Sequence, residues 1–262
     1  PELYLKRLVI GGMEKVYELG KNFRNEGVST KHNPEFTTIE IYQAYADYED
    51  AMDLTRELIT RSAEEAVGTE RPEIEGEVLD FSSSWKRISM VSAVEEATGL
   101  TDLKEIDTER LMDFAEERGL ELPEEGPEPA WGELVELLFE EYVEGDLFQP
   151  TFVTDFPTDI SPLAKTKRDG DRKLTERFEV FVGGIEVGNA FTELNDPLEQ
   201  RERFKSRMEG AEKKDEDFLK ALEYGMPPTA GIGIGLDRLL MAITGADSIR
   251  EVILFPALRR KE

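Results

Sequence analysis

Residues 20–45 of this chain, GKNFRNEGVSTKHNPEFTTIEIYQAY, contain the pattern on which the expected fold depends. Two strand-like runs flank a loop of about nine residues that includes Gly27 and Pro34, which predicts a long β-hairpin with an elaborate tip. Residues two apart on a strand share a face. One face is therefore predicted to carry Arg24 and Glu26 from the first strand and Phe36, Thr38, Glu40 and Tyr42 from the second. The other face of the second strand is predicted to join a core through Thr37, Ile39, Ile41 and Tyr45.

The polar face of this hairpin has two interpretations. For any single residue, a solvated sheet face with an Arg–Glu cross-strand pair is the simpler one. An aromatic ring, a tyrosine, an arginine and two glutamates around a loop with the chain's only histidine, His32, form an unusual set for a solvated surface. The combination therefore favours a binding site.

Composition restricts what such a site can be. The 262 residues, 39% of them apolar, suffice for a packed core, and the absence of a run of about 18 apolar residues or a signal-like leader predicts a cytoplasmic protein without a membrane span. With no cysteine and one histidine, zinc and thiolate sites are disfavoured, so a metal would be bound by oxygen, as Mg²⁺ is. The net charge of −26 disfavours a broad basic surface for nucleic acid.

The rest of the chain alternates between helical and strand-like regions. From about residue 49 to 145, apolar residues recur at helical spacing in an acidic background, which predicts a peripheral helical insertion. Strand-like runs follow in PTFVTDFP and ERFEVFVGGIEVGNAFTEL, with helices near 197–209 and 215–224. Hairpin-paired strands with helices between them predict an α+β domain on an antiparallel sheet flanked by helices.

The second hairpin places two carboxylates near each other. Glu179 and Glu186 lie on opposite arms of a Gly183-Gly184 turn and would repel each other, so a divalent cation between them is favoured. Glu186 differs in parity from Asn189, Phe191 and Glu193. A β-bulge at Gly188 would bring all four to one face. The alternative, in which Glu186 or the odd-numbered set faces water, has comparable weight.

The segment TAGIGIGLDRLLMAITG predicts a strand followed by a helix. Its alternating glycines, Gly231, Gly233 and Gly235, match neither a phosphate-binding P-loop nor a dinucleotide fingerprint. They would let another backbone or a flat ligand approach the strand closely. Arg238 would lie in the first turn of the helix, where a pair with Asp237 or a nearby surface carboxylate is the simplest expectation.

These segments together resemble the class II aminoacyl-tRNA synthetases, and among them the lysyl-tRNA synthetases. FRNEGVSTKHNPEFT is similar to motif 2 of that family and GIGIGLDRLLM to motif 3, while PTFVTDFPTDISPLAK and FVGGIEVGNAFTELNDP are similar to the lysine-type segments between them. The resemblance extends from PELYLKRL to VILFPALRR. It implies a sheet that holds ATP and L-lysine, formation of lysyl-adenylate and pyrophosphate, and transfer of the lysyl group to the 3′ end of tRNA(Lys).

The resemblance also implies a role for each polar residue of the two hairpins. Arg24, which would bridge the lysine carboxylate and the α-phosphate, and Arg238 are the expected catalytic residues. ATP would further contact Glu26 at the adenine amino group, Phe36 on the base opposite Arg238, and His32 and Asn33 at the phosphates. Glu179 and Glu186 would hold Mg²⁺. The lysine pocket would consist of Glu2, Glu193 and the Tyr42 hydroxyl at the side-chain ammonium, Glu40 at the α-amino group, Asn189 at the carboxylate and Phe191 on the aliphatic stem.

Departures from the family leave alternatives open. The chain begins at Pro1, after the anticodon-reading barrel and the motif 1 element through which family members form homodimers, which suggests that an N-terminal portion is missing. A paralogue that ligates a lysine-like group to a translation factor would have the same domain, although FTELNDP and AYADYED favour the tRNA enzyme. A non-catalytic regulatory module on the synthetase fold is the third possibility, and the intact arginines and acidic pair disfavour it.

Overall fold

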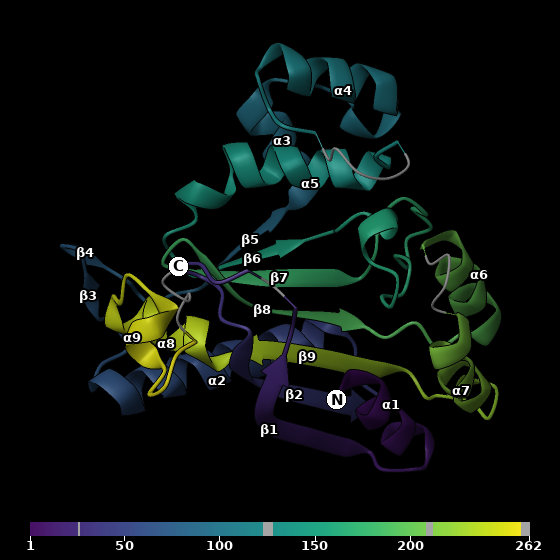
Figure 1. Cartoon of the computed structure of the whole chain (residues 1–262), viewed down its shortest axis with the longest axis horizontal. Helices are drawn as coiled ribbons and strands as arrows, with labels where there is room; N and C mark the ends of the chain where they lie inside the picture. Colours follow the sequence, from purple (N-terminus) through teal and green to yellow (C-terminus); the bar gives the residue numbers. More distant parts are fainter. Residues whose placement is uncertain (26, 123–127, 208–211, 258–262) are drawn as a thin grey trace, which may run out of the picture.

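A seven-stranded sheet with the order β1-β2-β9-β8-β7-β6-β5 forms the centre of the molecule (Figure 1). The structure, a computed structural model, describes residues 1–25, 27–122, 128–207 and 212–257. The strands are β1 Lys15–Phe23, β2 Glu35–Ala44, β5 Lys86–Ser89, β6 Thr151–Thr154, β7 Arg177–Val182, β8 Ile185–Thr192 and β9 Thr229–Gly235, and a separate pair is formed by β3 Glu73–Ile74 and β4 Glu77–Val78. Neighbouring strands of the large sheet are antiparallel except β5 and β6. The predicted α+β fold on an antiparallel sheet is confirmed, with one parallel pair at its edge.

Both predicted hairpins are present. β1 ends before Arg24, so the loop of the first hairpin covers residues 24–34 and is longer than predicted. The turn of the second hairpin consists of Gly183 and Gly184, with φ of 62° and 72°. A side chain is strained at such angles, which explains why both positions are glycine.

A bulge in β8 changes which residues face the site. β7 pairs with Glu186 and Gly188 in succession, so Val187 is the extra residue. The predicted bulge is therefore confirmed, one position away from Gly188. Gly188 has a different constraint, because a Cβ there would lie 2.5 Å from the carbonyl oxygen of Gly233. As a result of the bulge, Glu186 and Asn189 both line the same cavity.

The two faces of the sheet support separate cores. Val180 and Phe181 follow each other on β7 and belong to different hydrophobic clusters. On the Val180 side, α2 (Tyr48–Val67) and α8 (Leu236–Thr244) cover the strands, and the predicted core residues Ile39 and Ile41 pack there. Asp47 caps the start of α2 by accepting from two backbone N–H groups, which satisfies donors that the first turn leaves open.

The Phe181 side of the sheet is covered only at its ends. The helices α3 (Met90–Thr98), α4 (Thr108–Glu117) and α5 (Trp131–Tyr142) form a layer beyond β5 and β6 (Figure 1). At the other end, α1 (Glu2–Ile10) packs on Tyr42, and α7 (Glu212–Leu222) packs on α1 beside α6 (Pro197–Arg207). The short α9 (Ile249–Val252) follows α8. The middle of this face is left for a site.

The segment predicted as an insertion, about residues 49–145, contains elements of two kinds. α2 packs against the central sheet and β5 joins it, so these two belong to the body of the domain. The helices α3, α4 and α5 form the separate layer. Tyr45, predicted for the core, is 75% exposed instead, because β2 ends at Ala44 and the chain turns there with a φ of 59° at Tyr45. Among the described residues, no helix has the length and apolar character needed to cross a lipid bilayer.

Candidate active site

Strand register arranges the site in two neighbouring rows that cross the sheet. Directly opposed residues of antiparallel strands share a face. One row consists of Glu40, Gly233, Asn189 and Glu179, and the next consists of Tyr42, Gly231, Phe191 and Arg177. Because β9 contributes only glycine to both rows, the face is hollow in its middle. A cavity of about 350 Å³ lies there, lined by residues of both rows.

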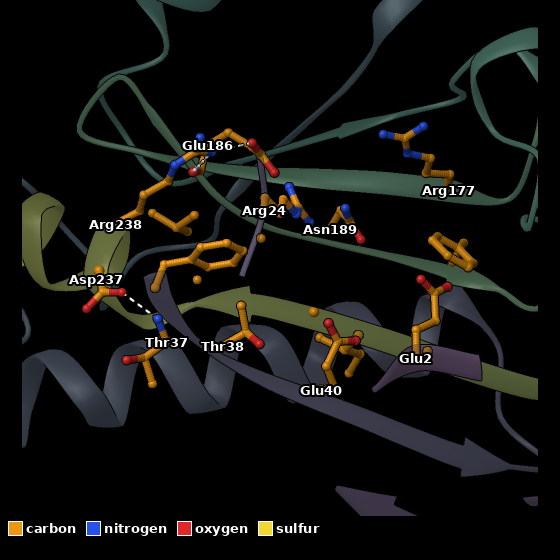
Figure 2. Close-up of a pocket in the computed structure, with 18 of the residues that line it drawn as sticks. Glu2, Arg24, Thr37, Thr38, Glu40, Arg177, Glu186, Asn189, Asp237 and Arg238 are labelled. Atoms are coloured by element: carbon orange, nitrogen blue, oxygen red, sulfur yellow. Dashed lines mark hydrogen bonds and ion pairs between the residues drawn. The ribbon is translucent and has the colours of Figure 1, made fainter. Parts of the chain in front are cut away.

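The cavity has two ends of different chemistry (Figure 2). Asp237, Arg238 and Glu186 lie at one end, Glu2 and Glu40 lie toward the other, and Arg24 and Asn189 lie between them. Residues from the first hairpin, the second hairpin, β9 with α8, and α1 therefore meet in one place. This arrangement brings together the segments that the sequence singled out.

The acidic end contains three carboxylates and one ammonium group. Glu193 is 1% exposed, and its Oε2 lies 2.6 Å from Nζ of Lys6, which also lies 2.9 Å from Oε1 of Glu2. Tyr42 donates a hydrogen bond of 3.2 Å to Glu40 Oε2. Glu193 Oε1 is buried without a hydrogen-bond donor among the described residues. It would lie 1.9 Å from a Cβ at Gly231, so the missing side chain makes room for it.

Burial and mutual repulsion control the protonation of this end. Burial raises the pKa of Glu193 to about 8, Lys6 opposes the rise, and Glu2 adds to it. Burial and the charge of Glu2 also raise the pKa of Glu40. Burial acts to lower the pKa of Lys6, but the charges of Glu193 and Glu2 raise it, so Lys6 is an ammonium. The end therefore favours cations.

The opposite end is organised around Arg238. Its guanidinium lies 2.7 Å from Glu186 Oε2 and 2.9 Å from His32 Nε2, so of the two carboxylate partners expected it pairs with a neighbouring one and not with Asp237. Asp237 instead accepts a hydrogen bond of 2.6 Å from the backbone N–H of Thr37, which fixes α8 to β2. These contacts hold a guanidinium and an imidazole at the cavity wall.

The first hairpin supplies an arginine and an aromatic ring to the middle of the site. The guanidinium carbon of Arg24 lies 5.2 Å from the centre of the Phe36 ring. The predicted arrangement had Phe36 and Arg238 on the two sides of a base, and it stays a prediction. Glu26, predicted to contact adenine, lies outside the described residues.

The hairpin tip is fastened through Asn33. Its side chain donates to the carbonyl oxygen of Glu35 at 2.6 Å and accepts from the N–H of Ala257 at 3.1 Å, and the residue is 4% exposed. Both ends of the amide are thus used to hold the loop against the C-terminal segment. The predicted phosphate contact of Asn33 stays a prediction, whereas His32 has its ring beside Arg238.

The acidic pair Glu179 and Glu186 is placed diagonally across the hairpin. Glu179 opposes Asn189, while Glu186 opposes Phe181. Both line a second cavity of about 260 Å³ that adjoins the first through His32 and Arg238.

Their repulsion is only partly relieved by the protein. Burial raises the pKa of Glu179 to about 8, and the charges of Glu186 and Glu136 add to the rise. Arg177 opposes it from 2.5 Å, which the sequence reasoning had not anticipated. Among the described residues, no group of three acidic or histidine side chains could hold a metal alone.

Two contributors to the site were missed at the sequence level. Lys6 lies one helical turn after Glu2 on the buried stripe of α1, and this spacing could have indicated a pair. Arg203 of α6 donates to the carbonyl oxygens of Ser161 and Ala164 at 3.0 and 2.6 Å, and both residues line the cavity. No local sequence pattern connects these two segments.

Comparison with known proteins places the chain in a family. The model of tRNA synthetases class II (D, K and N) matches residues 1–259. The lysine–tRNA ligase of Carboxydothermus hydrogenoformans is 52% identical over 100% of this chain and 54% of its own length. The lysine–tRNA ligase of Bacillus subtilis is 51% identical over 99% of this chain and 53% of its own length. The lysine–tRNA ligase of Staphylococcus aureus is 49% identical over the same shares of the two chains. The chain spans about half the length of the curated relatives it matches. With the family model covering nearly its whole length over a sheet of the expected kind, the chain belongs to the class II tRNA synthetases of the D, K and N type.

Proposed function

We propose that this chain is the catalytic domain of a lysine–tRNA ligase. The observation that carries the proposal is the acidic end of the cavity, which Glu2 and Glu40 line and beside which Glu193 is buried, close enough for the charges of Glu2 and Glu40 to raise its pKa. The letters of the family denote aspartate, lysine and asparagine. Aspartate would bring a further carboxylate into this end, and asparagine has no side-chain charge to offer. Lysine brings two ammonium groups, and a buried carboxylate is stable only with a countercharge.

The amino acid is proposed to lie along the two rows. Its side-chain ammonium would be held by Glu193 and Glu2 near the Tyr42 hydroxyl, with Phe191 along the aliphatic stem. Glu193 Oε1 supports this placement, because it is a buried acceptor without a donor among the described residues. Glu40 would take the α-amino group. The carboxylate would then point to Asn189 and Arg24, toward the middle of the cavity (Figure 2).

ATP is proposed to occupy the Arg238 end. Phe36 and Arg238 would enclose the base, and Glu26 would accept from its amino group. His32 and Asn33 are proposed to contact phosphates. Oxygens and ring faces of a nucleotide suit guanidinium groups, which donate in a planar fork and stack on aromatic rings.

Activation is proposed to proceed by in-line attack on the α-phosphorus. An oxygen of the lysine carboxylate forms the new P–O bond, the bond to the bridging oxygen of the β-phosphate breaks, and pyrophosphate leaves with that electron pair. Arg24 lies where it could contact both reacting groups and neutralise the charge that gathers between them. The protein's contribution is position and charge, because the reaction needs no protein nucleophile.

Mg²⁺ is proposed as the cofactor, held by Glu179 and Glu186. The raised pKa of Glu179 fits a cation site, because burial and the charge of Glu186 outweigh the opposing charge of Arg177 and a bound cation would add further countercharge. Two carboxylates provide too few oxygens for Mg²⁺, so phosphate oxygens and water would complete its shell. When bound, the ion would withdraw charge from the phosphates.

The test is amino-acid-dependent exchange of pyrophosphate into ATP by the chain. Lysine should support exchange, while aspartate and asparagine should not. Exchange with aspartate or asparagine at a rate similar to lysine, or none with any of the three, would exclude the proposal.

The partners beyond lysine and ATP also belong to the proposal. The acceptor is proposed to be tRNA(Lys), in the cytoplasm, with a homodimer formed when the family's motif 1 region is present. Lysylation assays with tRNA and, separately, a translation factor distinguish the ligase from the paralogue considered above. Lysine transfer to the factor alone would reject the tRNA assignment while leaving the activation step intact.

A further inference from the structure

An ammonium group of the protein is already buried beside the acidic end of the cavity. Lys6 is 1% exposed and lies between Glu193 Oε2, at 2.6 Å, and Glu2 Oε1, at 2.9 Å. These two carboxylates are the ones proposed above for the side-chain ammonium of lysine. None of the proposed roles in binding or activation uses Lys6.

We propose that Lys6 is a positioning residue that selects the substrate: its ammonium sets the charge and the depth of the pocket to fit a diamino acid. The inference rests on the proposed function and names what gives that function its specificity. Lys6 itself touches neither reacting group.

The charge count supports this role. If all three carboxyls are ionised, Glu2, Glu40 and Glu193 contribute three negative charges, and Lys6 matches one of them. Two charges are then left for the substrate to match, and the raised pKa values of Glu193 and Glu40 show that they are costly without it. A diamino acid brings two ammonium groups, and its own carboxylate is directed to Arg24. An amino acid with one ammonium would leave a carboxylate without countercharge in a buried place.

The packing of Lys6 supports its proposed role in setting the depth of the pocket. Its Nζ lies 5.3 Å from the ring centre of Phe191 and 5.9 Å from those of Tyr42 and Phe218. Three rings and two carboxylates thus surround the ammonium, and such a cation is held firmly. Because Phe191 is the ring proposed for the aliphatic stem, the ammonium closes the pocket just beyond it.

The groups that face Lys6 determine how its removal would change the pocket. They are Glu2 on its own helix, Glu40 and Tyr42 on β2, and Glu193 after β8. Lys6 opposes the upward shift of the Glu193 pKa that burial produces. Without Lys6, Glu193 would keep its proton to a higher pH and would accept the substrate ammonium only above that pH.

The experiment compares Lys6→Met, Lys6→Arg and the surface control Lys21→Met in the whole chain. Lysine-dependent pyrophosphate exchange is measured between about pH 6.5 and 9, with KM obtained separately for lysine and ATP. Lys21 is suitable as a control because its side chain is half exposed and pairs with Glu35 outside the acidic end.

Lys6→Met is expected to raise the KM for lysine at pH 7 by roughly 30-fold while changing the KM for ATP by less than about 3-fold. The pH at which lysine binding improves should move upward by about one unit relative to wild type. Lys6→Arg should restore most of the affinity, and Lys21→Met should match wild type. In Lys6→Ala, added methylammonium should restore lysine use in part, and neutral methanol should not.

The outcomes separate the inference from the function on which it rests. If wild type shows no exchange with lysine, the proposed function fails and the inference fails with it. If wild type is active and Lys6→Met loses lysine and ATP use equally, or keeps the wild-type pH profile, Lys6 is only structural and the inference is wrong. The same conclusion follows if wild type and Lys6→Met prefer lysine over ornithine, which is one methylene shorter, by the same ratio of kcat/KM.

Discussion

Replacing Gly231 by alanine tests whether the glycine floor makes room for Glu193. The added Cβ would lie 1.9 Å from Glu193 Oε1 and 2.7 Å from Tyr42 Cε1. An ordinary contact needs about 3.5 Å, so the carboxylate must retreat by roughly 1.5 Å. Such a movement is sufficient to break the contact of 2.6 Å with Lys6.

The expected magnitude has two parts. Overpacking against the buried Tyr42 ring should reduce the free energy of unfolding by about 1–3 kcal/mol. Displacing the buried carboxylate should also cost about 3 kcal/mol of transition-state stabilisation with lysine, which is the lower end for a broken buried ion pair. This loss corresponds to roughly a 100-fold fall in kcat/KM for lysine. The KM for ATP should change little, because Gly231 lies at the acidic end.

The assay is lysine-dependent pyrophosphate exchange together with a denaturant titration. Gly20→Ala is the matched control, since a Cβ there has its nearest neighbour, Glu18 Oε1, at 3.7 Å. Gly20→Ala should keep wild-type exchange. If folded Gly231→Ala used lysine within about 3-fold of wild type, the placement of Glu193 over this glycine would be refuted.

Three further outcomes are expected. Glu193→Gln should abolish lysine-dependent exchange while ATP still protects the chain against thermal unfolding; exchange near the wild-type rate would remove Glu193 from the lysine pocket. The pKa of Glu193 is raised from 4.5 to about 8, so its contribution to stability is complete below pH 4.5 and is lost as the pH rises through about 8. Melting temperatures measured from pH 6 to 9 should therefore fall less steeply in Glu193→Gln than in wild type, and equal slopes would contradict this. Arg203→Met should raise the KM for lysine by roughly 10-fold, because Arg203 holds the Ser161 to Ala164 wall through two carbonyl oxygens, and an unchanged KM would show that the wall stands without it.

Much of the fold could be predicted because turns, strand faces and bulges depend on residues that are close together in the sequence. Gly183 and Gly184 indicate their turn directly, and a bulge was one of two solutions to the parity conflict around Glu186 and is the one that the structure contains. Strand alternation also identified the face of β2 that carries Glu40 and Tyr42, and it assigned Ile39 and Ile41 to the core.

Long-range partners could not be predicted in the same way. Helical periodicity describes one face of α2 and one of α5 equally well, so it did not show that α2 belongs to the central sheet. The sequence favoured a metal beside Glu179 and did not show that Arg177, on the same strand face, also lies 2.5 Å from it. Such contacts depend on the length of the side chains and on how the loops bring distant segments together. Neither property produces a repeating pattern in the sequence. Tyr45 shows the same limit, since one residue of positive φ ended the alternation.

The floor of the cavity is largely main chain, because the β9 residues that face it are Gly231, Gly233 and Gly235. Backbone atoms are the same in every residue, so such a floor carries no side chain that could distinguish one amino acid from another. An enzyme engineer who wished to change the amino acid accepted here would find no floor side chain to reshape, and would have to work on the flanking walls: β2, β8 and the first turn of α1.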